Sequence, residues 1–171
     1  KPVRPSDLFE TLVAARGLSN RGDKNTATAP ISPAPLARKR KKIQALLAED
    51  NLVNAEIGIE FLSILGCEVT LAMNGVEAVA TFERGRFDIV FMDCQMPEMD
   101  GLEASRRIRE CETARGLAPT PIVALTANSY ESDKRSCREA GMDDFLAKPF
   151  NEAGLAAVIE RVVALKDREQ A

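Results

Sequence analysis

The stretch Phe87-Asp88-Ile89-Val90-Phe91-Met92-Asp93 contains a short, uninterrupted apolar run that ends on a carboxylate. A second run of the same kind, Ile122-Val123-Ala124-Leu125, ends on Thr126. Strands that are apolar throughout are typical of a parallel sheet that helices cover on both faces. These two segments therefore predict the centre of such a sheet, with a polar residue at the end of each strand.

Short apolar segments alternate with amphipathic segments on both sides of this centre. A strand followed by a helix recurs five times, which predicts an α/β fold with a doubly wound, five-stranded parallel sheet. The expected strands lie in IQALLA, EVTLA, FDIVFMD, PIVALTA and DFLAKP, in that order. The expected helices lie in NAEIGIEFLSILG, GVEAVATFERG, GLEASRRIRECETA, SDKRSCREAG and EAGLAAVIERVVALK. Gly66, Gly85 and Gly141 stand where three of these helices should end.

Composition limits the chemistry that the chain can carry out. Its 171 residues have room for one ordinary domain and a tail, and no apolar run approaches the ~18 residues that span a bilayer. The formal net charge of −3 argues against a nucleic-acid-binding domain. Because the chain has no histidine, it cannot supply a His-containing catalytic triad, a His-bearing zinc site or a phosphohistidine. Its chemistry must rest on carboxylates, hydroxyls and lysine.

The cysteines point to a reducing environment. Cys67, Cys94, Cys111 and Cys137 show neither C-x-x-C pairing nor metal-like spacing. The start of the chain shows no secretory signal, so a cytoplasmic location is expected, which is compatible with a membrane anchor elsewhere in a longer parent protein. We therefore expect four free thiols that pack as small, buried or half-buried apolar side chains.

Polar side chains collect at the expected carboxyl ends of four strands: Glu49-Asp50, Asp93, Thr126 and Lys148. These ends meet at one edge of a parallel sheet, where ligands bind. Each residue alone could simply cap a helix or form a turn. Clustered carboxylates, however, suppress one another's ionisation unless a cation lies among them. Oxygen ligands without histidine or thiolate favour Mg²⁺ completed by phosphate oxygens, to which lysine and threonine could donate hydrogen bonds.

Four segments together resemble the receiver domain of response regulators, the CheY-like phosphoacceptor of two-component systems. The segments are Glu49-Asp50, FMDCQMPEMDG at 91–101, ALTA at 124–127 and AKPF at 147–150. The resemblance implies a flavodoxin-like sheet in the order 2-1-3-4-5, formed by residues 41–171. It also implies that the domain catalyses its own phosphorylation and dephosphorylation.

The resemblance assigns roles at the sheet edge. Asp93 would accept the phosphoryl group from a phosphohistidine. Mg²⁺ would bind Asp50, Asp93 and the backbone carbonyl of Gln95, and Glu49 would act mainly through a metal-bound water. Glu49 departs from the aspartate that is more frequent at its position in the family, which affects how that water is held. Lys148 would neutralise charge on the phosphoryl oxygens.

Further implied roles concern signalling and the lifetime of the acyl phosphate. Thr126 and Phe145 would form a switch pair, although Phe145 could be only a core strand residue. Gln95 and Asn128 would tune the rate of hydrolysis. The surface from Tyr130 to Phe145 would then be the face through which phosphorylation is read out.

The first 40 residues suggest a longer parent protein. Residues 1–12 can be laid against residues 148–159, with Lys-Pro in register, so residues 1–16 are expected to be the C-terminal helix remnant of a preceding receiver-like domain. A chance Lys-Pro before an amphipathic helix is the alternative. Residues 17–40 have the composition of a flexible linker. Tandem receivers resemble the C-terminal part of a hybrid sensor histidine kinase.

The expected partners are therefore a histidine kinase transmitter or a histidine phosphotransfer protein, with a dimer left open. No contact with nucleic acid or membrane is expected of this chain. A pseudo-receiver that acts only by binding other proteins is the main alternative. A haloacid-dehalogenase-like hydrolase is disfavoured because Gln95 stands where its second aspartate belongs, and a mononucleotide binder because no glycine-rich phosphate loop follows the first strand.

Overall fold

The computed structural model describes residues 42–127 and 131–169. This part of the chain alternates strands and helices in the order β1 (Ile43–Ala48), α2 (Leu52–Ile64), β2 (Cys67–Ala72), α3 (Gly75–Arg84), β3 (Ile89–Asp93), α4 (Gly101–Arg115), β4 (Ile122–Thr126), α5 (Glu131–Glu139), β5 (Asp144–Ala147) and α6 (Glu152–Glu169). None of these helices is both long enough and apolar enough to cross a membrane. The expected remnant at 1–16, the linker at 17–40, Asn128 and Tyr130 lie outside the described residues, and the domain boundaries stay predictions.

The strands form one parallel sheet in the order β2-β1-β3-β4-β5, which confirms the predicted flavodoxin-like topology. In the register, Ala48 pairs with Met92, Asp93 with Leu125, and Thr126 with Ala147. The carboxyl ends of β1, β3, β4 and β5 therefore reach the same edge of the sheet. This alignment places the residue that follows β1 beside the last residue of β3.

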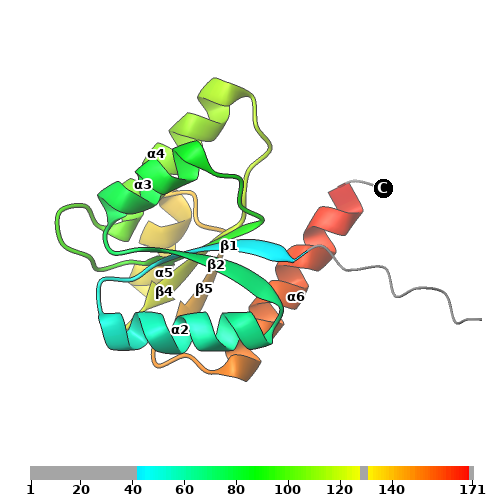
Figure 1. Cartoon of the computed structure of the whole chain (residues 1–171). Coiled ribbons are helices and arrows are strands. Elements are labelled where there is room, and N and C mark those ends of the chain that lie inside the picture. The colour runs from blue at the N-terminus through cyan, green and yellow to red at the C-terminus, as the bar shows by residue number, and fades with distance from the viewer. Residues whose placement is uncertain (1–41, 128–130, 170–171) are drawn as a thin grey trace, which may run out of the picture. The chain divides into compact units, whose positions relative to one another are not determined.

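Helices α2 and α6 cover one face of the sheet, and α3, α4 and α5 cover the other (Figure 1). Strand β3 contributes to both layers because successive side chains of a strand point to opposite faces. Ile89 and Phe91 pack with the α2 and α6 side chains, whereas Val90 and Met92 pack with those of α3, α4 and α5. The sheet is thus buried on both sides, which explains why its central strands are apolar throughout.

The ends of the helices follow local sequence signals. Asn51 precedes α2, and its side chain accepts hydrogen bonds from the backbone N–H groups of Val53 and Asn54. Gly66 follows the end of α2 with φ +84°, a conformation that glycine adopts without steric cost. Gly116 ends α4 with φ +62° in the same way, and the sequence interpretation had not identified it as a cap.

A buried ion pair holds the opposite edge of the sheet. Glu112 on α4 is 2% exposed and accepts hydrogen bonds from Thr120 N at 2.6 Å and Arg109 Nη1 at 2.6 Å. Arg109 also donates to Gly141 O at 2.9 Å and Asp143 Oδ2 at 2.8 Å. These contacts join α4 to the segments that enter β4 and β5. They hold α4 in a fixed position against β4 and β5, whose carboxyl ends lie at the candidate site.

Candidate functional site

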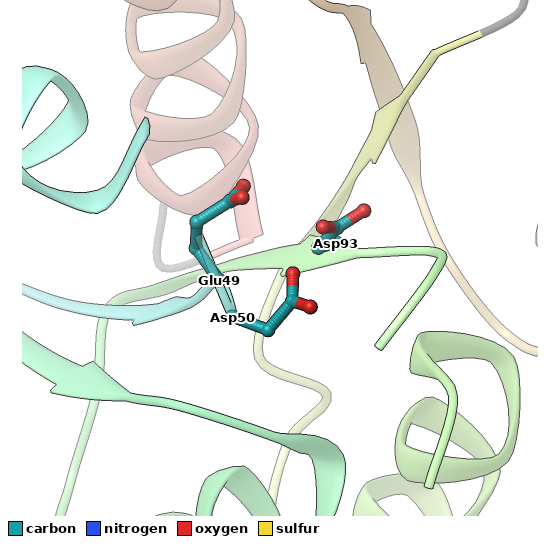
Figure 2. A group of neighbouring side chains, drawn as sticks. All are labelled: Glu49, Asp50 and Asp93. Atoms are coloured by element: carbon teal, nitrogen blue, oxygen red, sulfur yellow. The ribbon is translucent and has the colours of Figure 1, made fainter. Parts of the chain in front are cut away.

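Three carboxylates converge at the carboxyl edge of the sheet (Figure 2). Glu49 and Asp50 directly follow β1, and Asp93 is the last residue of β3. One oxygen from each carboxylate lies within 4.8 Å of the other two. Glu49 is fully buried and Asp93 is 5% exposed, whereas Asp50 faces solvent. Glu49 and Asp93 are therefore two buried acids, and the exposed Asp50 lies next to them on the solvent side.

Lys148 lies directly between the two buried acids. Its Nζ is 2.6 Å from Glu49 Oε2 and 2.7 Å from Asp93 Oδ2. The residue follows β5, and its backbone N donates a hydrogen bond to Thr126 O at 2.8 Å, which anchors it to the end of β4. One ammonium group cannot balance three carboxylates, so the cluster keeps an excess of negative charge.

Neutral groups complete part of the shell around these acids. The backbone N of Gln95 donates to Asp93 Oδ1 at 3.1 Å, and Asn54 Nδ2 donates to Glu49 Oε1 at 3.0 Å. Glu49 Oε2 has an ion-pair distance to Lys148 but no hydrogen bond of acceptable geometry within the described chain. The ammonium of Lys148 compensates the charge of this buried oxygen, and a bound water could supply the hydrogen bond that it lacks.

Sequence reasoning missed Asn54. The residue lies in the first turn of α2, and the Asn51 cap fixes that turn beside the end of β1. The sequence did offer a signal, because Asn54 is an amide residue in the first turn of the helix that follows Glu49-Asp50. Its hydrogen bond orients the carboxylate of Glu49.

The pKa of Asp93 is raised above its ordinary value. Burial is the main cause and nearby Glu49 adds to it, while the hydrogen bonds from Lys148 and Gln95 act in the opposite direction. Burial also lowers the pKa of Lys148, but the adjacent carboxylates of Asp93 and Glu49 outweigh burial, so the net pKa of Lys148 is raised. The lysine therefore stays cationic, and the negative charge on Asp93 remains only partly compensated.

The donor set at this edge fits a small divalent cation. It consists of carboxylate oxygens from Glu49, Asp50 and Asp93, and the backbone of Gln95 follows two residues after Asp93. Oxygen donors without histidine or thiolate are the ligands that Mg²⁺ and Ca²⁺ prefer. Excess negative charge and a raised Asp93 pKa are the conditions that such a cation relieves.

The remaining residues singled out from the sequence lie around this cluster. Thr126 is 7% exposed at the end of β4, and Gln95 is exposed; both line a pocket of about 230 Å³ beside α5. Phe145 is half-buried, packs against the core, and has Lys134 Nζ 4.7 Å from the centre of its ring. Its position is compatible with either a switch residue or a core strand residue. Asn128 lies outside the described residues.

The fold and the site define a doubly wound α/β domain whose carboxyl edge carries two buried acids, an exposed acid and a lysine. Residues 45–160 match the sequence pattern of the family described as "Response regulator receiver domain". The chain belongs to this family. The resemblance inferred from the sequence motifs is confirmed.

Hybrid histidine kinases are among the most similar proteins. The chain is 45% identical over 130 residues to hybrid signal transduction histidine kinase B of Dictyostelium discoideum. That alignment covers 71% of this chain but only 6% of the kinase, so the chain spans a small part of the length of this relative.

Solved receiver domains have the same architecture. The receiver domain of the sensor histidine kinase PA1611 from Pseudomonas aeruginosa PAO1, solved with a magnesium ion in its active-site cleft, is 43% identical with a TM-score of 0.66, over 72% of this chain and 99% of that one. The receiver domain of Ssk1, co-crystallised with the histidine phosphotransfer protein Ypd1 of Saccharomyces cerevisiae, is 38% identical with a TM-score of 0.64, over 71% of this chain and 86% of that one.

Proposed function

We propose that this receiver domain takes a phosphoryl group from a phosphohistidine onto Asp93, with Mg²⁺, as one step of a two-component phosphorelay. The proposal rests on the groups that surround the carboxylate of Asp93. Its carboxylate lies 2.7 Å from Lys148 Nζ and 3.1 Å from Gln95 N, and it shares the edge of the sheet with Glu49 and Asp50. A buried nucleophile beside a cation and a metal-type donor set suits phosphoryl transfer.

The chemistry needs few groups because phosphoryl transfer passes through a loose, in-line transition state. A carboxylate oxygen of Asp93 forms the new bond to phosphorus while the bond to the donor nitrogen breaks, and the electron pair stays on the imidazole. Lys148 donates to a phosphoryl oxygen and balances its charge. Mg²⁺, held by Asp50, Asp93 and the Gln95 carbonyl, would supply further charge neutralisation. Glu49 holds the ammonium of Lys148 in place from its other side.

The later steps of the proposal concern Thr126, Phe145, Gln95 and Asn128. Thr126 lies at the end of the strand next to β3, from which its hydroxyl can turn toward a new phosphoryl group. Phe145 would then move behind it, and α5 and β5 would pass the change to a partner. Gln95 and Asn128 would control the access of water to the acyl phosphate.

A small phosphodonor tests the proposal without a partner protein. Incubation with acetyl phosphate and Mg²⁺ should add one phosphoryl group to the wild-type chain, measured by intact mass, and none to Asp93→Asn. Asp100→Asn is the matched control, because Asp100 caps α4 nearby and asparagine caps helices equally well. Wild-type protein that stays unmodified while a known receiver is phosphorylated would favour the pseudo-receiver alternative.

Binding of Mg²⁺ should stabilise the fold. At a Mg²⁺ concentration 100 times the dissociation constant, the free energy of unfolding should rise by about 2.7 kcal/mol, measured as a shift in Tm. Asp50→Asn should remove most of the shift, whereas Asp100→Asn should retain it. An equal shift in Asp50→Asn would contradict the assignment of Asp50 as a ligand.

The stabilisation by Mg²⁺ should depend on pH through Asp93. Because its folded-state pKa is raised, the metal-free group stabilises the fold fully only below its unfolded pKa, and this contribution is lost as the pH rises through the folded pKa. Mg²⁺ binds the ionised carboxylate, so the stabilisation by Mg²⁺ should increase as the pH rises. The Tm shift should be largest above the folded pKa of Asp93 and should vanish as the pH falls through it. A shift independent of pH would place the metal elsewhere.

The partner that we propose is a histidine phosphotransfer protein that docks on α2. Its phosphohistidine must reach Asp93 from the carboxyl edge, where α2 begins. Apolar side chains are exposed near the start of this helix, at Leu52 (63%), Val53 (65%) and Ile57 (41%), and Ile64 (60%) is exposed at its far end. Exposed apolar side chains beside a site favour a protein partner there. The complex of Ssk1 with Ypd1 supports a partner of this kind.

Truncation of two of these side chains tests the docking face. Ile57→Ala should weaken phosphotransfer from a phosphorylated histidine phosphotransfer protein about 10-fold, with no change in the reaction with acetyl phosphate. Ile64→Ala is the matched control, since Ile64 is equally apolar but lies about two turns farther from the site. No loss in Ile57→Ala, or a loss confined to Ile64→Ala, would rule out the start of α2 as the contact.

A further inference from the structure

Two thiols face each other beside Asp93. Cys94 directly follows that residue, and Cys137 lies on α5, 43 residues later in the chain. Their sulfur atoms are 3.7 Å apart. The other two cysteines lie elsewhere: Cys67 belongs to the core on the opposite face of the sheet, and Cys111 is half-buried on α4. Cys94 and Cys137 are thus placed to react with each other.

Small molecules can reach both sulfur-bearing residues. Cys94 and Cys137 line the pocket of about 230 Å³ that also contacts Gln95, Thr126 and Ser136. A water molecule occupies about 30 Å³ of liquid, so a small oxidant such as hydrogen peroxide fits there. The pocket therefore joins the thiol pair to solvent and extends to Gln95 and Thr126, which flank the proposed phosphorylation site.

A bond between the two sulfurs requires only a short movement. The S–S bond length is about 2.05 Å, so the sulfurs must approach by roughly 1.7 Å. The backbone of Cys94 is held on both sides, because its N donates to Leu125 O at 3.0 Å and its O accepts from Gly101 N at 3.2 Å. The adjustment must therefore come from rotation of the two side chains and a shift of α5.

We propose that Cys94 and Cys137 form a reversible disulfide that ties α5 to the phosphoacceptor end of β3. Hydrogen peroxide first oxidises one thiol to a sulfenic acid and leaves as water. The second thiol then attacks that sulfur, the S–S bond forms, and the hydroxyl departs with the proton as a second water. Each sulfur loses one electron in total, and the peroxide gains two. A dithiol reductant reverses the reaction.

The surroundings of Cys94 disfavour the thiolate form of its side chain. Burial raises the pKa of Cys94, and the facing Cys137 and the neighbouring Asp93 add to the rise, while Lys148 acts in the opposite direction. The short distance between the sulfur atoms, and not the ionisation of either thiol, is therefore what favours the bond.

The consequence for signalling rests on the proposed function. If phosphorylation of Asp93 is read out through α5 and β5, a covalent link from Cys94 to α5 restrains the element that must move. The oxidised domain should then still be phosphorylated at Asp93 but should no longer change at α5. The receiver would respond to its kinase only under reducing conditions.

Peptide mapping tests the disulfide itself. After treatment of the whole chain with hydrogen peroxide and alkylation of free thiols, a non-reducing digest should contain a peptide pair that joins Cys94 to Cys137. Cys137→Ser and Cys137→Ala should both abolish the link, and Cys111→Ser should leave it unchanged. A digest in which Cys94 and Cys137 are alkylated or singly oxidised, while Cys111 has reacted, would overturn the proposal.

Hydrogen–deuterium exchange tests the effect on signalling. Amide exchange in residues 134–142 should change on phosphorylation of the reduced protein and stay constant in the linked protein. A linked protein whose exchange responds as strongly as the reduced one overturns the regulatory role. If neither form gains a phosphoryl group, the proposed function is wrong and so is its coupling to the thiols. The peptide pair found by mapping tests the disulfide independently of that outcome.

Discussion

Replacement of Lys148 by methionine is expected to slow the phosphorylation of Asp93 about 10²–10³-fold, the effect of removing one preorganised charge-stabilising donor from an active site. Methionine retains much of the length of the side chain but removes the ammonium, which lies 2.7 Å from Asp93 Oδ2 and 2.6 Å from Glu49 Oε2. The rate of adduct formation with acetyl phosphate, followed by intact mass, measures the effect.

The same substitution should strengthen the binding of Mg²⁺. An ammonium among metal ligands repels the ion, so its removal leaves the carboxylates free for the metal. Calorimetric titration should therefore show tighter binding in Lys148→Met while phosphorylation slows. Lys42→Met removes an equal charge at an exposed position and should change neither quantity. Parallel loss of metal binding and phosphorylation in Lys148→Met would indicate a damaged site and contradict a role in the transfer step.

Gly101→Ala should destabilise the fold by about 3 kcal/mol or more, the upper end of the cost of overpacking. A Cβ atom at this position would collide with the backbone carbonyl oxygen of Asp93. The two residues are held close because Gly101 N donates to Cys94 O at 3.2 Å at the start of α4. Relief of the collision requires the backbone of the phosphoacceptor strand to move, so the variant should also lose phosphorylation. Urea unfolding measures the stability change.

Gly116→Ala is the control for this substitution. Gly116 has φ +62° at the end of α4, and an added Cβ would meet no atom within 4 Å. The expected cost is about 1 kcal/mol, from the left-handed conformation alone. Phosphorylation should be unchanged, because the residue lies at the far end of α4. Equal destabilisation by the two substitutions would show that the contact with Asp93 is not the cause.

The sequence pattern was sufficient for a parallel sheet and for the convergence of the site, whereas the strand order came from the family resemblance. The wholly apolar runs that end at Asp93 and Thr126 predicted a parallel sheet with polar residues at one edge, and the structure has that sheet. Glu49, Asp50, Asp93 and Lys148 could be expected to meet because parallel strands bring their carboxyl ends together. Topology alone determines this outcome, so side-chain detail was not needed.

Contacts that depend on register and rotamers were not predictable in this way. The hydrogen bond from Asn54 to Glu49 depends on how the Asn51 cap turns the first residues of α2. The proximity of Cys94 and Cys137 depends on the packing of α5 against the sheet, and no spacing in the sequence signals it. These are the contacts through which the chain differs in detail from what a motif implies.

Localisation of the phosphoryl group tests the central claim most directly. After reaction with acetyl phosphate and Mg²⁺, reduction with borohydride converts an aspartyl phosphate to homoserine but leaves free carboxylates intact. Peptide mass analysis is expected to find homoserine at position 93 and unmodified Glu49 and Asp50. Conversion at either of those residues in place of Asp93, or an adduct that borohydride does not reduce, would contradict the assignment of Asp93 as the phosphoacceptor.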